Sequence, residues 1–464
     1  MASTYLSRTP SSASNRKTWT WSAWVKRSSL STGNQVLFEG IDGSGFPEKL
    51  QFTGSDILEY DHDIAGTDYT VFVTDRVFRD TNAWYHLVFA KDTTQSTEAD
   101  RIKIYVNGEQ QSLSEYQLGF PPQNYDGAIN DTVAHYIGAN NGEYFNGSMS
   151  HIHFIDGTAY DATAFGEYDA NGVWKIKTSP SVTYGTNGFF ILKDGNSVTD
   201  QSPNTNNFTV GGGTLTNTED CPSNVFPTIN PLTYSTTKWN LEYGNLRTNG
   251  LFSGESAAWR SVYGTLGASS GKYYFEMKVT RTYSVDSNNI IIGIVDAEQM
   301  KYEGDNGKFF GTSRGYGYHA KDGKKLNNDS VTANGVNYGN SWTTNDIIGC
   351  AFDLDYHKLY FSKNGSWQNS GDPTSGATGT GSAFDLATGY TYLPTVSHFY
   401  DDDRIEFNFG NGYFGTTAVA SAGTNASGNG IFEYDVPKNF PLSPSYFICS
   451  ASTIPIIILF ESTL

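Results

Sequence analysis

Strand-like segments separated by turn residues recur along the whole chain, and helical periodicity is hard to find. In residues 18–26 (TWTWSAWVK), aromatic and aliphatic side chains interleave with small polar ones, as on a β-strand with a buried face. Asn107-Gly108 and Asn364-Gly365 are strong type I′ hairpin signals. Charged residues make up only 17% of the chain, which excludes a coiled coil. The sequence therefore predicts an all-β protein built from antiparallel sandwiches.

The strand-like segments gather in two blocks of similar length. The 464 residues are enough for about two to four domains. We predict sandwiches over residues 1–180 and 236–412, joined by an Asn/Thr/Pro-rich connector over 181–235 that contains possible closing strands. Residues 413–464 begin with a stretch rich in Gly, Ala, Ser and Thr. They are expected to form a flexible arm followed by an apolar C-terminal tail.

Acidic residues outnumber basic ones, 48 to 30, which gives a formal net charge of −18. The basic footprint of a nucleic-acid-binding protein is missing, and an acidic surface is repelled from anionic membranes. The polar N-terminus does not have the pattern of a secretory signal. The three cysteines lie far apart, which predicts no disulfide framework. We expect no nucleic-acid binding and no membrane insertion.

Three segments of the first block form a recognisable pattern. They are residues 18–26, residues 84–86 (WYH) before an apolar strand, and the hairpin at residues 105–108 (YVNG). Together they resemble a laminin G-like module of the concanavalin A-like lectin/glucanase group. The resemblance covers about residues 1–180 and implies an antiparallel sandwich of the jelly-roll type.

The second block resembles a SPRY domain, which is another concanavalin A-like sandwich. The matching segments are residues 271–276 (GKYYFE), 292–294 (IGI), 346–365, 393–394 (LP) and 408–410 (NFG). The strongest part is 346–365, where a buried strand, an Asp-containing turn and a second strand end at Asn-Gly. The two resemblances imply two concanavalin A-like sandwiches in tandem.

The junction between the blocks has a further resemblance. Residues 153–158 (HFIDGT), 172–175 (GVWK) and 184–189 (YGTNGF) look like segments of structural proteins from marine bacteriophages, notably those of cyanobacteria. This implies a virion protein that is made in the host cytoplasm, released by lysis, and placed in a tail or head appendage. The implied partners are other virion proteins, with a host-surface glycan as a candidate ligand. By analogy, the protein is expected to be a homo-oligomer such as a trimer.

The polar segment EYDHD at residues 59–63 is the candidate catalytic or ligand site of the first block. On a strand, Glu59, Asp61 and Asp63 share one face. Residues four positions apart on a strand are roughly 13 Å apart, too far for the two carboxylates of a retaining glycosidase. We therefore expect no enzyme activity. Asp61, His62 and Asp63 remain candidate ligand contacts or calcium ligands, and the alternative is a solvated strand or loop.

Two further segments give candidate sites in the second block. Tyr316 and Tyr318 lie in a Gly-rich segment of a composition found in binding loops, and placement in the core is the equal alternative. An oxygen-rich run downstream could bind structural Ca²⁺ or form an exposed polar turn; no other cofactor is expected. Its candidate residues are Tyr400 for ligand contact and Asp401, Asp402 and Asp403 for the metal.

The apolar end of the chain is a candidate docking element. It is too short to cross a membrane, and its β-branched content favours a strand added to a partner's sheet. The candidate docking residues are Ile456, Ile457, Ile458, Leu459 and Phe460. The leading hypothesis is a non-enzymatic phage virion protein, a fibre or spike, that binds a host surface or a subunit. The alternatives are a capsid decoration or spacer protein without a receptor role and, by fold analogy alone, a glycan-degrading enzyme.

Overall fold

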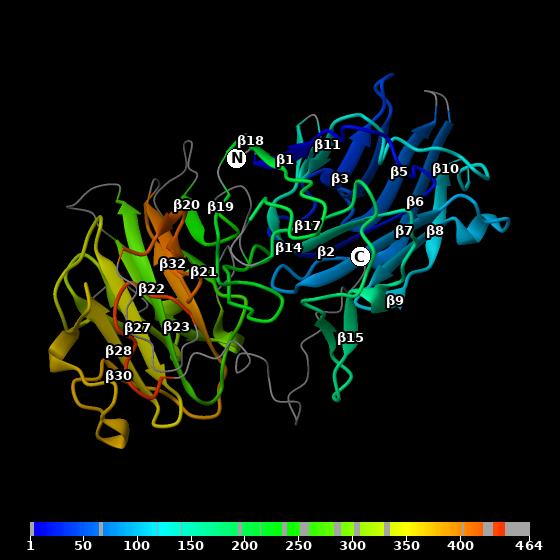
Figure 1. Cartoon of the computed structure of the whole chain (residues 1–464). Coiled ribbons are helices and arrows are strands. Elements are labelled where there is room, and N and C mark those ends of the chain that lie inside the picture. Colours follow the sequence, from blue (N-terminus) through cyan, green and yellow to red (C-terminus); the bar gives the residue numbers. More distant parts are fainter. Residues whose placement is uncertain are drawn as a thin grey trace, which may run out of the picture. The chain divides into compact units, whose positions relative to one another are not determined.

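The computed structural model describes residues 4–440 except for 65–67, 118, 141, 194–196, 214, 234–238, 251–258, 283–288, 301–306, 329–334, 401–402 and 421–429. The chain divides into two compact units, Met1–Val225 and Phe226–Leu464 (Figure 1). Each unit has two antiparallel sheets around an apolar core. The described residues contain short 3₁₀ turns but no α-helix, so the predicted all-β fold is confirmed. No helix in the described ranges is long and apolar enough to span a bilayer.

The larger sheet of the first unit has eight strands in the order β10-β6-β5-β4-β3-β11-β1-β18. Their bounds are β1 Tyr5–Arg8, β3 Gln35–Ile41, β4 Pro47–Phe52, β5 Ile57–Ile64, β6 Asp68–Val77, β10 Leu113–Gln117, β11 His135–Ile137 and β18 Thr209–Gly211. The second sheet has six strands in the order β17-β14-β2-β7-β8-β9. Their bounds are β2 Thr18–Arg27, β7 Tyr85–Asp92, β8 Ile102–Val106, β9 Glu109–Gln110, β14 Gly147–Asp156 and β17 Phe189–Ile191.

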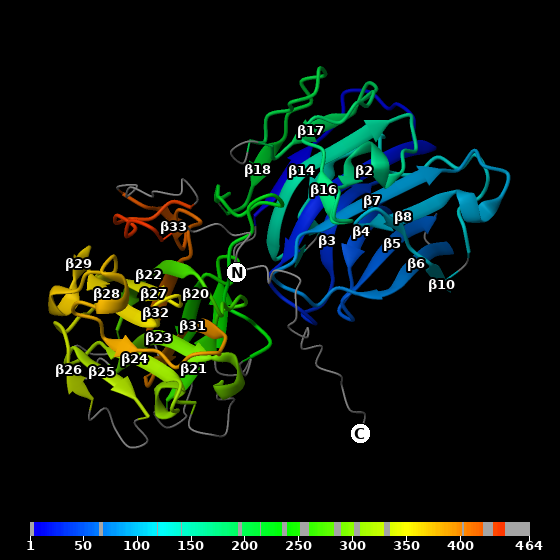
Figure 2. The ribbon, with the colours of Figure 1, turned by 90° about the horizontal axis from the view of Figure 1, so that it is seen from below.

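Short elements lie outside these two sheets. Two hairpins pair β12 with β13 and β15 with β16. The bounds are β12 Ala139–Asn140, β13 Glu143–Tyr144, β15 Gly166–Tyr168 and β16 Trp174–Ile176, with 3₁₀ turns η1 Glu98–Asp100 and η2 Ala162–Ala164. The β15–β16 hairpin is on the side of the first unit formed by the six-stranded sheet (Figure 2).

Side chains along β2 alternate between its two faces, so its tryptophans lie on different faces of the sheet. Trp19 and Trp21 lie in the core between the two sheets and are fully buried. Trp21 stacks on Phe38 of the opposite sheet with 6.2 Å between ring centroids. Trp24 has the opposite parity, lies on the outer face of its sheet, and stacks with His86 at 5.0 Å. One strand therefore supplies both the core and an outer aromatic surface.

Two strands in the stretch predicted as a connector close the first sandwich. β17 pairs with β14, and β18 pairs with β1, so both sheets end on residues from the 181–235 region. Asn187 adds to this closure, because its backbone N–H donates to Asp156 at 3.0 Å and its side-chain amide donates to Asn130 at 2.8 Å. The division between the units falls after residue 225, inside the predicted connector.

The second unit repeats the two-sheet plan. Its eight-stranded sheet has the order β19-β20-β32-β22-β27-β28-β29, with β30 also paired to β28, and its six-stranded sheet has the order β21-β31-β23-β24-β25-β26. The larger sheet contains β19 Trp239–Glu242, β20 Arg247–Gly250, β22 Lys272–Arg281, β27 Ile347–Asp353, β28 Lys358–Lys363, β29 Ser366–Trp367, β30 Phe384–Asp385 and β32 Arg404–Asn408. The smaller contains β21 Arg260–Tyr263, β23 Ile290–Asp296, β24 Gly315–His319, β25 Lys324–Asn327, β26 Val336–Asn337 and β31 Tyr392–His398. The remaining elements are β33 Tyr413–Phe414, β34 Thr417–Ala418, η4 Ala297–Gln299, η5 Phe309–Gly311, η6 Gln368–Ser370 and η7 Gly376–Thr378.

The two Asn-Gly pairs form the tight hairpins that the sequence predicts. Asn107 and Gly108 both have positive φ, 50° and 88°, and join β8 to β9. Asn364 and Gly365 also have positive φ, 47° and 78°, and join β28 to β29. Type I′ turns need this left-handed backbone at both central positions, which Asn and Gly tolerate best.

The described part of residues 413–464 is packed, which differs from the flexible arm expected there. β33 pairs with β34, and Phe432 and Phe440 are buried in the core of the second sandwich. The two carboxylate oxygens of Glu276 accept hydrogen bonds from the backbone N–H groups of Glu433 and Tyr434, each at 2.9 Å. Apolar burial and paired amides therefore hold residues 430–440 on the sandwich, a role that the surrounding Gly- and Ser-rich composition did not indicate.

Candidate binding site

The polar segment on β5 alternates between the two faces of the large sheet in the first unit. Tyr60 and His62 point inward and are almost fully buried, whereas Glu59, Asp61 and Asp63 are partly exposed on the outer face. The predicted sharing of one face by these three carboxylates is therefore confirmed. The prediction that His62 contacts a ligand at the surface is wrong, because the period of two places its ring in the interior.

Lys49 is the centre of a polar surface on this outer face. Strand register places Lys49 of β4 opposite Asp61 of β5 and Glu39 of β3. The Nζ atom of Lys49 lies 3.2 Å from a carboxylate oxygen of Asp61 and 3.8 Å from one of Glu143 in the β12–β13 hairpin. We call Glu39, Lys49, Glu59, Asp61 and Glu143 the carboxylate face. Lys49 supplies the ammonium group of this face, and the other four residues supply its carboxyl groups.

Burial changes the protonation of the carboxylate face. It raises the pKa of Asp61 and of Glu59, although the nearby Lys49 opposes both shifts. For Glu39, which is fully buried, burial raises the pKa to about 8. Neither carboxyl oxygen of Glu39 has a hydrogen-bond partner among the described residues. Glu39 therefore holds a proton at neutral pH, and Asp61 and Glu143 are the carboxylates paired with Lys49.

A second charged group lies directly beneath this face, inside the sandwich. Glu48 and Lys91 are both fully buried and form an ion pair with 2.5 Å between Oε1 and Nζ. Tyr60 donates its hydroxyl to Glu48 at 2.8 Å, and the backbone N–H of Ile129 donates at 2.8 Å. Burial alone would raise the pKa of Glu48, but the ammonium of Lys91 lowers it to about 2. For His62, burial lowers the pKa to about 4, so the ring is neutral.

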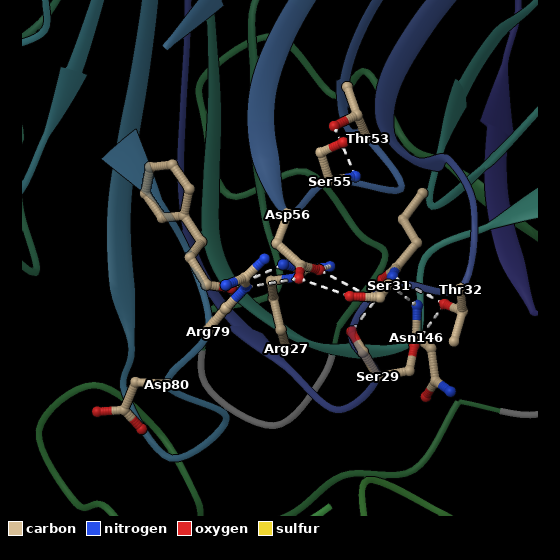
Figure 3. A network of polar contacts seen from close by, with 12 residues as sticks. Arg27, Ser29, Ser31, Thr32, Thr53, Ser55, Asp56, Arg79, Asp80 and Asn146 are labelled. Atoms are coloured by element: carbon tan, nitrogen blue, oxygen red, sulfur yellow. Dashed lines mark hydrogen bonds and ion pairs between the residues drawn. The ribbon is translucent and has the colours of Figure 1, made fainter. Parts of the chain in front are cut away.

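A third network fixes one end of the first sandwich (Figure 3). Asp56, in the turn between β4 and β5, has a fully buried carboxylate that lies 3.0 Å from Nη2 of the buried Arg27. The same carboxylate accepts hydrogen bonds from the backbone N–H of Ser31 at 2.8 Å and from Nε of Arg79 at 3.1 Å. These contacts join three separate loops, which fixes the turn that leads into β5.

The candidate tyrosines of the second unit lie in its core. Tyr316 and Tyr318 on β24 are 5% and 0% exposed, opposite Ile294 and Ile292 of β23. The interpretation of these two residues as an exposed binding loop is therefore wrong, and the alternative of core placement holds. The two residues are two positions apart on β24, so their side chains share one face of the strand, and that face is turned to the interior of the sandwich.

The acidic run after β31 is described only in part. Tyr400 is partly exposed and its ring packs edge-on against Phe399 at 4.9 Å. Asp403 is buried, at 1% exposure. Asp401 and Asp402 lie outside the described residues, as do the candidate docking residues Ile456, Ile457, Ile458, Leu459 and Phe460. In the described ranges, no group of three or more His, Cys, Asp or Glu residues is arranged to hold a metal ion.

The carboxylate face is the arrangement that the structure adds to the sequence prediction. The sequence singled out Asp61 but missed Lys49, Glu39 and Glu143, which come from two other strands and a hairpin. Carboxylate oxygens accept hydrogen bonds and the Lys49 ammonium donates them, and adjacent strands space these groups about 4.8 Å apart. The face can therefore hydrogen-bond a ligand that carries several hydroxyl groups or a cationic group.

Comparison with known proteins assigns a domain to each block. Residues 2–162 match the Concanavalin A-like lectin/glucanases superfamily, as a laminin G-type domain, and residues 272–412 match the SPRY domain. The chain therefore carries a laminin G-like, concanavalin A-like domain followed by a SPRY domain. The carboxylate face lies within the first match and the Tyr316–Tyr318 core within the second.

Individual relatives match only short parts of the chain. Over 158 residues the chain is 30% identical to the Ran-binding proteins 9/10 homolog of Drosophila melanogaster, a match that covers 34% of this chain and 14% of the relative. Over 173 residues it is 28% identical to the probable ATP-dependent RNA helicase ddx1 of Dictyostelium discoideum, covering 36% of this chain and 18% of that protein. These relatives are eukaryotic, and the chain spans less than a quarter of the length of each.

Two solved structures give similarly partial matches. The SPRY domain of human HERC1 is 18% identical, with a TM-score of 0.29 over 39% of this chain and 96% of that chain. The heptameric SAP-like pentraxin from Limulus polyphemus is 14% identical, with a TM-score of 0.26 over 34% of this chain and 72% of that chain.

Proposed function

We propose that this chain is a non-enzymatic binding protein of a bacteriophage particle, located in a tail or head appendage. Its lectin-like and SPRY sandwiches contact the host surface or neighbouring subunits. The tandem of a lectin/glucanase-type sandwich and a SPRY domain supports the binding role. The marine-phage-like segments at residues 153–158, 172–175 and 184–189 support the virion location. In this role the protein is a homo-oligomer and uses many weak contacts per particle.

The observation that carries the binding role is the carboxylate face. Its groups are fixed on three paired strands and the β12–β13 hairpin, so little conformational entropy is lost when they engage a ligand. Asp61 is 18% and Lys49 11% exposed at the side chain, so both are recessed yet reachable. A glycan hydroxyl group can donate to the Asp61 carboxylate and accept from the Lys49 ammonium at the same time. A host-surface glycan is therefore the proposed ligand.

In this proposal the carboxylates have a role other than catalysis. Glycoside hydrolysis needs one protonated carboxyl group and one ionised carboxylate about 5–10 Å apart on opposite sides of a bond. Here Asp61 is paired with Lys49, Glu59 accepts a hydrogen bond from Gln51, and the protonated Glu39 is inaccessible. The proposed role of these groups is recognition.

Labelling of host cells with the purified protein tests the proposal. Asp61→Asn should reduce the bound protein several-fold, because the variant loses the ionised acceptor beside Lys49. Asp126→Asn, which removes a half-exposed carboxylate elsewhere in the same domain, is the matched control and should label as well as the unmodified chain. No labelling by the unmodified chain, or equal labelling by Asp61→Asn, would refute this use of the face.

A second candidate function is a capsid decoration or spacer protein that docks through its C-terminal tail. The described residues that precede the tail favour it, because Phe440 is buried on the second sandwich beside Lys272, so the tail starts from a fixed point. Under this proposal, removal of residues 441–464 abolishes incorporation into particles. Normal incorporation of the truncated chain would exclude it.

A further inference from the structure

The β15–β16 hairpin covers the outer face of the six-stranded sheet in the first unit (Figure 2). Tyr168 and Trp174 are directly opposite in its register, so both side chains lie on the same face of the hairpin. The hairpin lies after residue 162, where the match to the concanavalin A-like superfamily ends. Its surface is therefore a property of this chain that the domain match does not cover.

Trp174 is fixed by an aromatic stack beneath it. Its Nε1–H donates to Nδ1 of His86 at 3.1 Å, and the two rings stack at 5.9 Å. With Nδ1 accepting, Nε2 of His86 carries the hydrogen and donates to the hydroxyl of Ser22 at 2.9 Å. Trp24 stacks on His86 at 5.0 Å. Burial lowers the pKa of His86 to about 3, so the ring stays neutral and this arrangement is kept at physiological pH.

Two glycines make room for the Trp174 ring. A Cβ atom at Gly108 would lie 2.5 Å from the ring, and one at Gly166 would lie 2.4 Å from it. Both distances are shorter than side-chain contacts allow, so only glycine permits this close approach at either position. Hydrogen bonding, stacking and glycine contacts together leave Trp174 a single position.

Tyr168 is held against Trp174 but stays open to solvent. Its ring packs edge-on to Trp174 with 4.8 Å between centroids, and its hydroxyl donates to the backbone oxygen of Asn107 at 3.3 Å. Even so, Tyr168 is 52% exposed, and Val173, which precedes Trp174 in the chain, is 48% exposed. Both ends of the Tyr168 side chain are fixed, which leaves a rigid aromatic surface facing outward.

The charges around this surface cancel. Glu167 lies opposite Lys175 in the hairpin register and 3.8 Å from Nζ of Lys177. Asp169 adds one carboxylate, and its side chain is already bonded to the backbone N–H groups of residues 171 and 173. In a chain of net charge −18, this is a locally balanced patch. It favours a neutral ligand over a charged one.

We propose that Tyr168, backed by Trp174, is the stacking face of a carbohydrate subsite that takes one pyranose ring of a neutral glycan. A rigid aromatic ring with a polar rim offers large contact area at low entropic cost. Two exposed apolar side chains are enough for one sugar ring but far below the roughly 800 Å² per partner of a stable protein interface. The subsite lies on the opposite sheet from the carboxylate face and does not depend on it.

Titration with neutral oligosaccharides tests the proposal on the full chain. The probes are cellohexaose, laminarihexaose and maltohexaose, with tryptophan fluorescence as readout because Trp174 contacts the site. At least one probe should bind saturably with a Kd below about 10 mM, which is the range of a weak site that acts in many copies. Tyr168→Ala should weaken that binding about tenfold, whereas Tyr168→Phe, which keeps the ring, should retain it.

Matched controls separate this outcome from unfolding and from the carboxylate face. Tyr356→Ala removes a tyrosine of similar exposure, 47%, from the second unit and should bind normally. Asp126→Asn, the control variant for the carboxylate face, should also leave the oligosaccharide response unchanged. Absence of saturable binding by the unmodified chain, or equal binding by Tyr168→Ala, would overturn the proposal. So would a photo-crosslinker at position 168 that captures another virion protein and no glycan. The carboxylate-face proposal would survive each of these results, since cell labelling reads it separately.

Discussion

Asp56 shows how a single carboxylate organises one end of the first sandwich. Its partners Arg27, Ser31 and Arg79 come from three different loops or strand ends (Figure 3). Burial alone would raise its pKa, but the hydrogen bonds from Ser31 and Arg79 outweigh burial, and the pKa of Asp56 is lowered. The ionised form is therefore the one that stabilises the fold.

Removal of the Asp56 charge should destabilise the first domain strongly. Asp56→Asn leaves the guanidinium of Arg27 buried without its counter-ion, and breaking a buried ion pair in this way costs about 3–5 kcal/mol. Urea unfolding of the first domain measures the loss. Asp100→Asn is the control, because its ion pair with Lys103 is exposed and should change the free energy of unfolding by less than about 1 kcal/mol. Similar losses in both variants would contradict this account.

Glu276 should make the stability of the second domain depend on pH. Burial raises its pKa from 4.5 to about 7, despite the opposing hydrogen bonds from residues 433 and 434. The folded state thus binds the proton more tightly than the unfolded state does. Its contribution is fully present below pH 4.5 and is lost as the pH rises through 7, by up to about 3 kcal/mol.

Unfolding of Glu276→Gln between pH 5 and pH 8 checks that pH dependence. The amide cannot ionise, so the decline in stability with rising pH should become smaller. Glu298→Gln removes an exposed carboxylate of the same unit and should keep the decline of the unmodified chain. An unchanged pH profile in Glu276→Gln would exclude Glu276 as its source.

At the scale of elements, side chains alternate between the two faces of a strand, and predictions that depended only on this alternation could succeed. The face shared by Glu59, Asp61 and Asp63 could be predicted, because it depends only on local alternation along one strand. The partners of Asp61 could not, since the register that brings Lys49 opposite it is set by a hairpin and by core packing.

Two other elements show the limits of local pattern. The sequence left a binding loop and core placement as equal alternatives for Tyr316 and Tyr318, and the glycine between them, which has no side chain, did not indicate which face is buried. Residues 430–440 lie in a polar, Gly-rich context, and only their contacts with Glu276 and the core identify them as part of the sandwich.

The segment at 430–440 should be required for the second domain. Phe432→Ala should destabilise that domain by about 3–5 kcal/mol, although residue 432 lies beyond the SPRY match that ends at 412, because it empties a fully buried site. Chemical denaturation followed on the second domain measures it. Thr417→Ala, on the exposed β34 hairpin, is the control and should have little effect. A negligible loss in Phe432→Ala would mean that the segment is dispensable.

At the scale of the molecule, the chain consists of two sandwiches, each with its own core. The sequence predicted this organisation because hairpin signals and strand patterns repeat in both blocks and both resemble domains of one superfold. The sequence indicated possible closing strands within residues 181–235, but it could not show that β17 pairs with β14 and β18 with β1, since these short pairings depend on distant partners. In the proposed function, the two sandwiches bind through several weak surfaces that are repeated on one particle.

Peptide mass spectrometry of purified particles of the proposed phage tests the central claim, the virion location, most directly. The account predicts peptides from both domains at a fixed copy number, with a handful of copies for a tail appendage and hundreds for a capsid shell. Purified particles free of the protein would contradict the account.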